Sequence, residues 1–360
     1  MKVLFIFYVP SGGVETLNRQ RSIALKEVGI TCHFLYYENR RNYINEHYNP
    51  VFIKSDEEEI ITLIKKHQYD AIVITSDFKM VPAIKKSGYN GKIFVEIQGY
   101  GSIQQTRYGF SIGKTLAEKD IDGFLNPRTP HISTLLSEMF PNVPKYEFNN
   151  CFDCSHFNYK ATGKSFVQPI IGWVGRIEDN KNWQEFLNIC FLLKRKLRNQ
   201  LQVYLFEDPT LSFPKDRENF LKTMKKYHLE KNINLLPNIP NEKMADYFSM
   251  ISDSGGFLCS TSKIEGAPLT ALEAMSCRCP ILTTDSSGIR TAVTHNVTGK
   301  YYEIGNPKEA VKEGVELIQN QTLRQTIINN AVSHVKKNFA PSLYAQNFKK
   351  IMTSTLPVSN

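Results

Sequence analysis

The sequence contains no apolar run long enough to cross a membrane. Its apolar start, Val3 to Val9, ends at Pro10-Ser-Gly-Gly13, whereas a transmembrane helix needs about 20 apolar residues. No small-residue cleavage site follows this start, so it predicts a first β-strand and not a signal peptide. With 41% hydrophobic and 22% charged residues, we expect a globular, cytoplasmic protein.

Cysteine is scarce and irregularly spaced. The seven cysteines are odd in number and form no recognisable disulfide framework. Cys151-Phe-Asp-Cys154 and Cys277-Arg-Cys279 each lack the second pair that a zinc site needs. The sequence therefore predicts neither disulfide bridges nor a structural metal.

Motifs for nucleotide cofactors and for nucleic acids are also missing. Neither G-x-G-x-x-G nor G-x-x-x-x-G-K-[ST] occurs. The net charge of +9 comes partly from clusters such as Lys65-Lys66 and Lys336-Lys337, which fall on expected helices and are mostly explained as solvated helix faces. We expect no nucleic-acid partner, although a basic surface would suit loose binding to an anionic membrane or a phosphorylated substrate.

The first half of the chain alternates apolar strands with amphipathic helices, which predicts a mostly parallel sheet with helices on both faces. The expected strands are Val3 to Val9, Thr31 to Tyr37, Ala71 to Thr75 and Lys92 to Ile97. Ligands bind such sheets at the carboxyl ends of the strands. Three loops therefore lie at the expected binding edge: Pro10 to Gly13, Ser76-Asp77, and Gln98 to Ser102.

A second α/β half follows the polar stretch Asn158 to Gln168. Its expected strands are Pro169 to Val174, Gln202 to Phe206, Ile233 to Leu236, Gly256 to Cys259 and Cys279 to Thr283. We predict two Rossmann-like, doubly wound domains that face a central cleft. The predicted division is an N-terminal domain at 1–157, a linker at 158–168, a C-terminal domain at 169–339, and a C-terminal helix in 340–360 that returns to the N-terminal domain.

The stretch Ser262 to Pro280 has the pattern strand, loop, helix, with Pro268 suited to the first helical turn. The free N–H groups and the positive dipole end of that helix favour an anion, most naturally a phosphate. Glu265 in the loop and Glu273 one turn into the helix can accept hydrogen bonds from sugar hydroxyls. A capped structural helix with a surface glutamate is the alternative interpretation of the same residues.

Two further loops carry residues suited to phosphate. Gly175-Arg176 and Lys181 place two cations on one loop, where arginine can bind a diphosphate bidentately and lysine acts as a point charge. Gly12-Gly13 forms a glycine-rich turn at the start of a helix, whose N–H groups can approach an anion. Taken singly, the cations also suit an ordinary surface, and the glycines suit a tight turn.

Together these motifs resemble the retaining nucleotide-sugar glycosyltransferases of the GT-B fold, in the large family 4 (glycosyl transferases group 1) that includes sucrose synthases and bacterial cell-envelope enzymes. The resemblance covers nearly the whole chain. It rests on Gly12-Gly13-Val14-Glu15, Asn150-Cys-Phe-Asp153 with Phe157, Val174-Gly-Arg-Ile177 with Lys181, the E-x7-E pattern from Glu265 to Glu273, and Pro280 with Ser287-Gly288-Ile289.

The resemblance implies a role for each matching position. Arg176 and Lys181 would bind the leaving diphosphate, and Glu265 the donor sugar; these three are the expected catalytic residues. Glu273 would hold the ribose and Asn238 would lie at the base edge. Further donor contacts are expected from Gly12, Gly13, Gly175, Gly266, Ala267, Pro268, Leu269 and Thr270. The family needs no divalent metal, and we expect neither a metal nor a cofactor here.

The sequence departs from the family pattern on the acceptor side. Many members carry a histidine after the fourth N-terminal strand, where this chain has Gln98 or, less well aligned, Glu96. Glutamine cannot act as a general base. The acceptor is expected in the loops Gln98 to Arg107, with Gln98, Gly99, Tyr100 and Arg107, and Tyr36 to Tyr48. Arg278 also replaces a glycine at a helix end that often needs positive φ.

The resulting hypothesis is a retaining glycosyltransferase that moves a hexose or N-acetylhexosamine from a UDP-sugar to a polar acceptor, such as an envelope glycan, a lipid-linked sugar or a small molecule. One alternative keeps the fold and changes the reaction, to a sugar-nucleotide epimerase or phosphorylase. Another is a non-catalytic sugar-nucleotide-binding protein, which Gln98 keeps open. A glycosidase is disfavoured because Glu273 would lie on a phosphate-binding helix.

Overall fold

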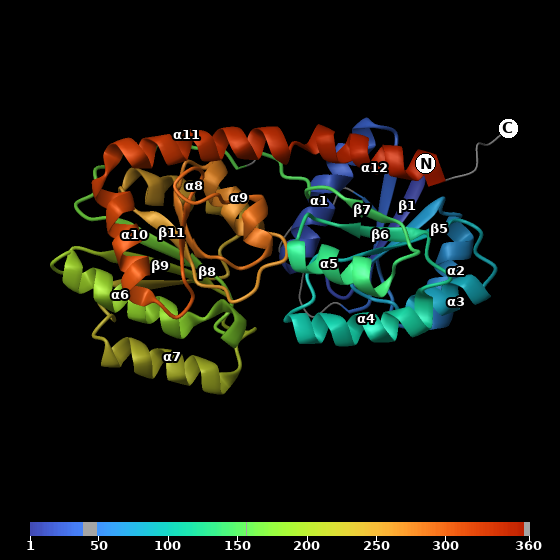
Figure 1. Ribbon diagram of the computed structural model, residues 1–360, viewed down its shortest axis with the longest axis horizontal. Coiled ribbons are helices and arrows are strands. Elements are labelled where there is room, and N and C mark those ends of the chain that lie inside the picture. The colour runs from blue at the N-terminus through green and yellow to red at the C-terminus, as the bar shows by residue number, and fades with distance from the viewer. Residues whose placement is uncertain (39–48, 156, 356–360) are drawn as a thin grey trace. The chain divides into compact units, whose positions relative to one another are not determined.

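The computed structural model describes residues 1–38, 49–155 and 157–355. The chain divides into two compact units. Unit 1 comprises Met1–Asp153 together with the C-terminal segment that begins at Asn338, and unit 2 comprises Cys154–Lys337. Figure 1 labels their helices and strands.

Unit 1 is built on a parallel sheet of seven described strands in the order β3-β2-β1-β4-β5-β6-β7. The chain order reverses between β1 and β4, and this switch point brings the loops after these two strands together at one edge. The strands are β1 (Lys2–Phe7), β2 (Thr31–Tyr36), β3 (Val51–Ile53), β4 (Ala71–Thr75), β5 (Lys92–Glu96), β6 (Gly123–Asn126) and β7 (Lys145–Glu147).

Helices cover both faces of this sheet, as the alternating pattern predicts. They are α1 (Gly12–Glu27), α2 (Glu57–His67), α3 (Met80–Lys86), α4 (Ile103–Ala117), α5 (Pro130–Met139) and α12 (Pro341–Thr355). The last of these packs against α1 (Figure 1) and adds Tyr344, Phe348 and Met352 to the core beneath it. The predicted return of the C-terminal helix to the N-terminal domain is therefore confirmed.

A buried ion pair fixes this packing. The guanidinium of Arg21 on α1 is fully buried and donates to Glu96 Oε1 at 2.6 Å, while lying 3.9 Å from the centroid of the Phe5 ring. It also reaches the Tyr344 hydroxyl at 3.4 Å, and Thr75 Oγ1 donates to the other Glu96 oxygen at 2.9 Å. These contacts pair the buried charge with a carboxylate and join α1, β5 and α12.

Unit 2 repeats the architecture with a parallel sheet of six described strands in the order β10-β9-β8-β11-β12-β13. Here the reversal lies between β8 and β11. The strands are β8 (Ile170–Val174), β9 (Gln202–Glu207), β10 (Ile233–Pro237), β11 (Phe257–Ser260), β12 (Ile281–Thr284) and β13 (Lys300–Tyr302). The helices are α6 (Trp183–Lys196), α7 (Pro214–Lys226), α8 (Asn241–Asp253), α9 (Leu269–Ser276), α10 (Pro307–Gln319) and α11 (Gln321–Asn338), with 3₁₀ turns η1 (Asp179–Lys181) and η2 (Gly288–Thr291).

One segment folds differently from the sequence prediction. The expected acceptor loop Gln98 to Arg107 is a loop only as far as Ser102, because α4 begins at Ile103. A capping box starts this helix: Ser102 Oγ accepts from Gln105 N at 3.3 Å, and Gln105 Oε1 accepts from Ser102 N at 2.8 Å. Arg107 is therefore a helical residue.

Two further findings concern the whole described chain. None of the described helices combines the length and the apolar character that a membrane span requires. All seven cysteines are free thiols, and all but Cys154 are buried. Burial in apolar surroundings raises the pKa of the Cys32 and Cys279 thiols to about 12, so both are protonated and unreactive at neutral pH.

Candidate active site

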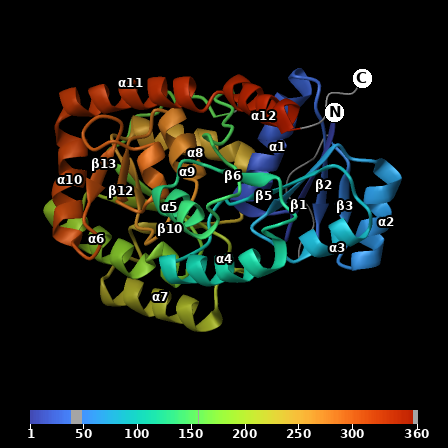
Figure 2. The same ribbon diagram turned by 45° about the vertical axis from the view of Figure 1, so that its right-hand side comes forward.

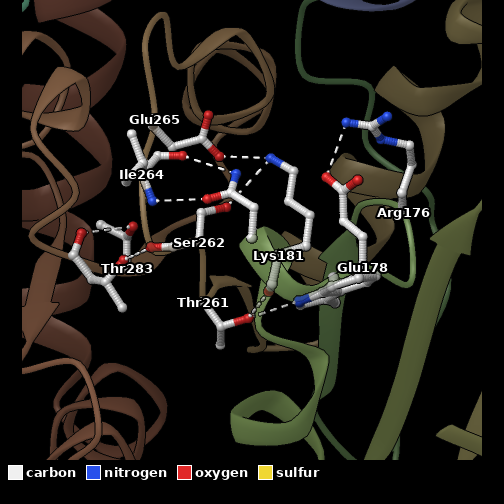
Figure 3. Close-up of polar contacts among 11 residues, drawn as sticks. Arg176, Glu178, Lys181, Thr261, Ser262, Ile264, Glu265 and Thr283 are labelled. Atoms are coloured by element: carbon white, nitrogen blue, oxygen red, sulfur yellow. Dashed lines mark hydrogen bonds and ion pairs between the residues drawn. The ribbon is translucent and has the colours of Figure 1, made fainter. Parts of the chain in front are cut away.

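Three loops of unit 2 leave the carboxyl ends of neighbouring strands. They follow β8, β11 and β12 and span residues 175–182, 261–268 and 285–287. Because β8 and β11 flank the switch point of the sheet, the first two loops lie side by side where an α/β sheet binds its ligands. Figure 3 shows the contacts between them.

The first contact joins two of the predicted catalytic residues. Lys181 Nζ lies 2.7 Å from Glu265 Oε1 and 3.3 Å from Ser262 Oγ (Figure 3). The lysine side chain is 24% exposed and the glutamate 19%, so the pair is partly shielded and still reachable from solvent. The lysine backbone is held in turn, because Thr261 Oγ1 donates to its carbonyl oxygen at 2.7 Å.

Asn180 ties the same two loops together by a second route. Its side-chain amide donates to the Ile264 carbonyl and accepts from the Ile264 N–H, both at 3.2 Å, and its own carbonyl accepts from Lys263 N at 2.8 Å. This pairing fixes the backbone directly before Glu265. Sequence reasoning assigned Asn180 no role, because its partner is 84 positions away.

The loop after β12 is fixed to the loop after β11 by close backbone contact. Gly288 N donates to the Glu265 carbonyl at 3.0 Å. A Cβ at Gly288 would lie 2.0 Å from the Gly266 oxygen and 2.6 Å from the Glu265 oxygen. Both neighbours are backbone atoms that cannot move aside, so only glycine allows this approach.

Arg176 lies in the same loop as Lys181 and has a different partner. Its guanidinium donates to Glu178 Oε1 at 2.9 Å and its side chain is 51% exposed (Figure 3). The preceding residue, Gly175, leaves room for the lysine stem, since a Cβ there would lie 3.0 Å from Lys181 Cγ. The structure thus brings Lys181 and Glu265 into contact. Among the described residues, Arg176 forms its ion pair with Glu178 and none with Glu265.

The helix α9 begins at Leu269, directly after Gly266, Ala267 and Pro268. Glu273 lies one turn into it, is buried, and accepts from Asn241 Nδ2 at 3.2 Å. At the other end, Arg278 has φ +62° where the sequence comparison expects glycine. Hydrogen bonds from Arg278 N to Met275 O and from Cys279 N to Ala274 O complete a Schellman cap.

The remaining predicted donor residues lie at strand ends in both units. Asn238 directly follows β10, has φ +51°, and donates its backbone N–H to the Glu207 carbonyl at 2.9 Å. In unit 1, Gly12 begins α1 with φ +79°, and Gly13 follows in the first helical turn, both exposed. Thr270 lies in the first turn of α9 and is partly exposed.

On the acceptor side, hydrogen bonds engage the predicted polar side chains. Gln98 and Asn150 exchange two amide hydrogen bonds of 3.1 and 2.7 Å. Arg107 forms a bidentate pair with Glu138 on α5, at 2.7 and 3.1 Å. Gly99 is exposed, and the Tyr100 ring packs on Gly109 of α4. Residues 39–48 of the expected loop Tyr36 to Tyr48 lie outside the described residues.

Sequence reasoning named Ser76-Asp77 as an edge loop and gave Asp77 no function. The Tyr37 hydroxyl donates to Asp77 Oδ2 at 2.8 Å, and Tyr8 stands edge-on to the Tyr37 ring at 5.7 Å. Burial and the nearby Asp77 carboxylate raise the pKa of Tyr8 to about 12. These side chains follow β1, β2 and β4 and form a polar, aromatic surface at the carboxyl edge of the first sheet.

Comparison with known proteins identifies relatives for much of the chain. Residues 158–334 match the family model described as glycosyl transferases group 1. Over 202 residues, 56% of this chain, the sequence is 26% identical to the capsular polysaccharide biosynthesis glycosyltransferase CapM of Staphylococcus aureus. Over 120 residues, 33% of the chain, it is 30% identical to an uncharacterized glycosyltransferase of Methanocaldococcus jannaschii. The matches span 49% and 32% of the lengths of these two proteins.

Solved structures match the chain over almost its whole length. A sucrose-phosphate synthase from Thermosynechococcus elongatus has a TM-score of 0.84 at 16% identity, over 99% of this chain and 100% of that one. HepE of Anabaena, solved with UDP and glucose, has a TM-score of 0.82 at 15% identity, over 98% and 100%. Identities this low speak for the fold alone, and the predicted GT-B fold with two Rossmann-like domains is confirmed.

Proposed function

Because residues 158–334 match the glycosyl transferases group 1 family model, we propose that this chain is a retaining glycosyltransferase with a UDP-sugar donor. The transferred group is a hexose or an N-acetylhexosamine. The observation that carries the proposal is the partly exposed Lys181–Glu265 pair at the switch point of the second sheet. It places a cation for a phosphate beside a carboxylate for a sugar.

Two cations and a helix N-terminus bind the diphosphate. In the absence of donor, Lys181 and Arg176 each hold a carboxylate oxygen, at 2.7 and 2.9 Å. Both cations therefore stand beside anionic oxygen atoms, and the diphosphate oxygens of the donor bind next to them. The first turn of α9, which follows Gly266, Ala267 and Pro268, adds the positive end of a helix dipole.

The sugar, the ribose and the base of the donor contact Glu265, Glu273 and the carboxyl end of β10. Glu265, which Lys181 and the Asn180-fixed backbone position, accepts hydrogen bonds from sugar hydroxyls. Glu273 is buried beside Asn241 and accepts from the ribose hydroxyls. Asn238, with its backbone bonded to the end of β9, lies at the edge of the base.

These groups stabilise the charges that develop during transfer. Breaking the anomeric C–O bond leaves positive charge on the sugar and negative charge on the diphosphate. Prepositioned cations near the leaving oxygen lower the barrier because they act where charge appears and need no reorganisation. The leaving phosphate oxygen takes the proton of the acceptor hydroxyl as that hydroxyl bonds to the anomeric carbon on the same face, so the configuration is retained.

The nucleotide and the acceptor class are proposed from chemistry and from relatives. UDP is favoured because HepE of Anabaena was solved with UDP-glucose and with UDP. A cell-envelope glycan or its lipid-linked precursor is favoured as acceptor because CapM acts in capsular polysaccharide biosynthesis. The acceptor binds the carboxyl edge of unit 1, which carries Gln98, Gly99 and Tyr100 after β5 and the surface formed by Tyr8, Tyr37 and Asp77, with Arg107 in the second turn of α4. We expect the reaction in the cytoplasm.

A donor screen tests this function. The full chain is incubated with UDP-glucose, UDP-N-acetylglucosamine and GDP-mannose, and its thermal unfolding midpoint and the release of nucleoside diphosphate are measured. We expect one UDP-sugar to raise the midpoint, because ligand binding stabilises the folded state, and we expect slow UDP release that EDTA leaves unchanged. The absence of any stabilisation, or an epimerised donor formed without acceptor, would contradict the proposal.

A further inference from the structure

Two neighbouring helices of unit 2 end in a group of basic residues. The helices α6 and α7 pack side by side (Figures 1 and 2). Their last turns and the residues that follow precede β9 and β10, so they lie at the amino edge of the second sheet. We call the basic residues there the amino-edge cluster: Lys194, Arg195, Lys196, Arg198, Lys225, Lys226 and Lys231.

Ring and backbone contacts hold the ends of the two helices together. The Phe191 and Tyr227 rings stack with their centroids 4.9 Å apart. Lys194 Nζ donates to the His228 carbonyl at 2.6 Å, and the Arg195 guanidinium lies 5.8 Å from the centroid of the Phe191 ring. The cluster therefore stands on a packed junction of α6 and α7.

The ends of both helices are capped by backbone groups. Asn199 N donates to the Lys194 carbonyl at 2.8 Å, and Leu229 N donates to the Met224 carbonyl at 3.0 Å, as in a Schellman cap. A cation in the last turn also interacts favourably with the helix dipole. Lys231 lies beyond the end of α7, so neither the caps nor the dipole explains the whole cluster.

Ion pairs do not neutralise the cluster. Within the described ranges, none of its seven side chains forms an ion pair, whereas Lys222 of the same helix α7 pairs with Glu218 at 2.5 Å. Several unpaired charges of one sign at close quarters raise the local potential and attract ions of the opposite sign. The amino edge of unit 2 is therefore a positive surface that is open to an anion.

A cavity of about 480 Å³ opens beside the cluster. Lys194 and Lys231 are among its lining residues, and Glu230 is the one carboxylate there. Pockets for small molecules commonly have volumes of about 300–1,000 Å³, and most are lined mainly by apolar side chains. This cavity has the same size and a polar lining, in which amides predominate: Gln168, Asn199, Gln202 and Asn232.

We propose that this cavity binds a soluble small molecule that carries two or more phosphate groups. Side-chain amides donate hydrogen bonds to phosphate oxygens, and the lysines add charge-assisted ones. A concave site of this size suits a small ligand better than the extended surface of a bilayer. The site goes beyond the proposed function. It lies at the amino edge of the sheet, opposite the carboxyl edge with Lys181 and Glu265, so both ligands can be bound at once.

Calorimetric titration with tripolyphosphate tests the proposal, using the full chain with and without saturating UDP. We expect saturable binding of tripolyphosphate that persists in the presence of UDP and weakens as salt is added. Loss of all tripolyphosphate binding when UDP is present would place that binding in the donor site and overturn the proposal. Binding of tripolyphosphate without binding of UDP would contradict the proposed function and leave the second site intact.

Variants assign the binding to the cavity. Lys194→Gln with Lys231→Gln removes both lysines of the lining and keeps a donor for the His228 carbonyl, and it should raise the tripolyphosphate dissociation constant at least about tenfold. The matched control is Lys336→Gln with Lys337→Gln, which removes the same charge from exposed positions on α11 and should change that constant less than about twofold. Unaltered thermal unfolding midpoints show that the variants fold.

Two further outcomes would count against the proposal. If the control weakens tripolyphosphate binding as much as the cavity variant does, the binding reflects net charge and not a site. If the chain binds vesicles that contain phosphatidylglycerol but shows no saturable binding of tripolyphosphate, the cluster contacts lipid and the cavity is not a small-molecule site.

Discussion

The two sheets present carboxyl-edge loops of the same topology and very different organisation. In unit 2, the loops after β8, β11 and β12 are fixed to one another through Asn180, Lys181, Glu265 and Gly288. In unit 1, the described polar side chains at the corresponding edge form two separate hydrogen-bonded groups: Gln98 with Asn150, and Tyr8 and Tyr37 with the loop Ser76-Asp77. Among the described residues, one set of contacts connects the loops of unit 2, whereas two separate sets lie at the edge of unit 1.

Under the proposed function, this difference follows from what each edge binds. A diphosphate and a ribose are the same in every nucleotide sugar, so the groups that hold them need a fixed arrangement of cations, carboxylates and N–H groups. Acceptors differ from one enzyme to the next. An edge with separate groups of contacts can change one group without disturbing the other. The predictions below test whether the connected edge carries the chemistry.

The largest effect is expected at Lys181. Lys181→Ala removes a cation placed for the leaving diphosphate, and loss of one such group typically lowers kcat about 10²–10³-fold. The control is Lys263→Ala, two residues from Glu265, whose ammonium pairs with the exposed Asp179 and should change kcat by less than about twofold, as exposed pairs contribute little. Steady-state rates of UDP release measure both. Equal losses of kcat in the two variants would contradict the claim that the connected loops of unit 2 carry the chemistry.

Gly288→Ala tests the connection between the loops themselves. The new methyl group would meet the Gly266 and Glu265 carbonyl oxygens, and relieving such overlap typically costs about 1–3 kcal/mol. We therefore expect a lower thermal unfolding midpoint together with an UDP dissociation constant raised roughly tenfold, since about 1.4 kcal/mol corresponds to a factor of ten. Unchanged UDP affinity in a destabilised variant would show that the third loop is independent of the donor site.

Substitution of Glu273 tests whether this carboxylate of unit 2 contacts the ribose. Glu273→Gln replaces charge-assisted hydrogen bonds by neutral ones, and we expect about a tenfold rise in the UDP dissociation constant. Wild-type protein should also bind 2′,3′-dideoxy-UDP more weakly than UDP, and the variant should have lost most of this preference. Glu309→Gln, which alters a carboxylate at the start of α10, is the control. A variant that still discriminates between the two ligands would contradict the assignment.

The smallest effect on chemistry is expected at Gln98. Gln98→Ala leaves the buried Asn150 without its amide partner, which typically costs about 1–3 kcal/mol of stability. The unfolding midpoint should fall while the UDP dissociation constant stays within about twofold of the wild-type value. A loss of UDP release as large as that of Lys181→Ala would show that the first edge also takes part in breaking the donor bond.

Much of the fold could be predicted because the strands are strongly apolar. Fully buried strands such as β4 (AIVIT) stand out in the sequence, and their alternation with helices implies parallel sheets. The prediction omitted β3, β6, β7 and β13, which are only three or four residues long and carry too little pattern. It also extended a loop into α4 as far as Arg107, although Ser102 and Gln105 have the spacing of a capping box.

Only part of the candidate site could be predicted from the sequence. Lys181 and Glu265 could be named from motifs, and the structure places them in contact. The roles of Asn180 and Gly288 could not be predicted, because each depends on backbone atoms that are distant in the sequence. On the acceptor side, residue type suggested available polar groups at Gln98 and Arg107. Sequence alone could not reveal that Asn150 and Glu138 engage them.

The central claim is that the connected edge of unit 2 binds a nucleoside diphosphate through Lys181 and Arg176. Calorimetric titration of UDP into the wild-type chain and into Lys181→Ala with Arg176→Ala tests it most directly. We predict saturable binding by the wild type and a dissociation constant raised at least about 100-fold in the variant, since each charge-assisted contact contributes roughly tenfold or more. Equal UDP affinity in the two proteins, or no binding by the wild type, would contradict the claim.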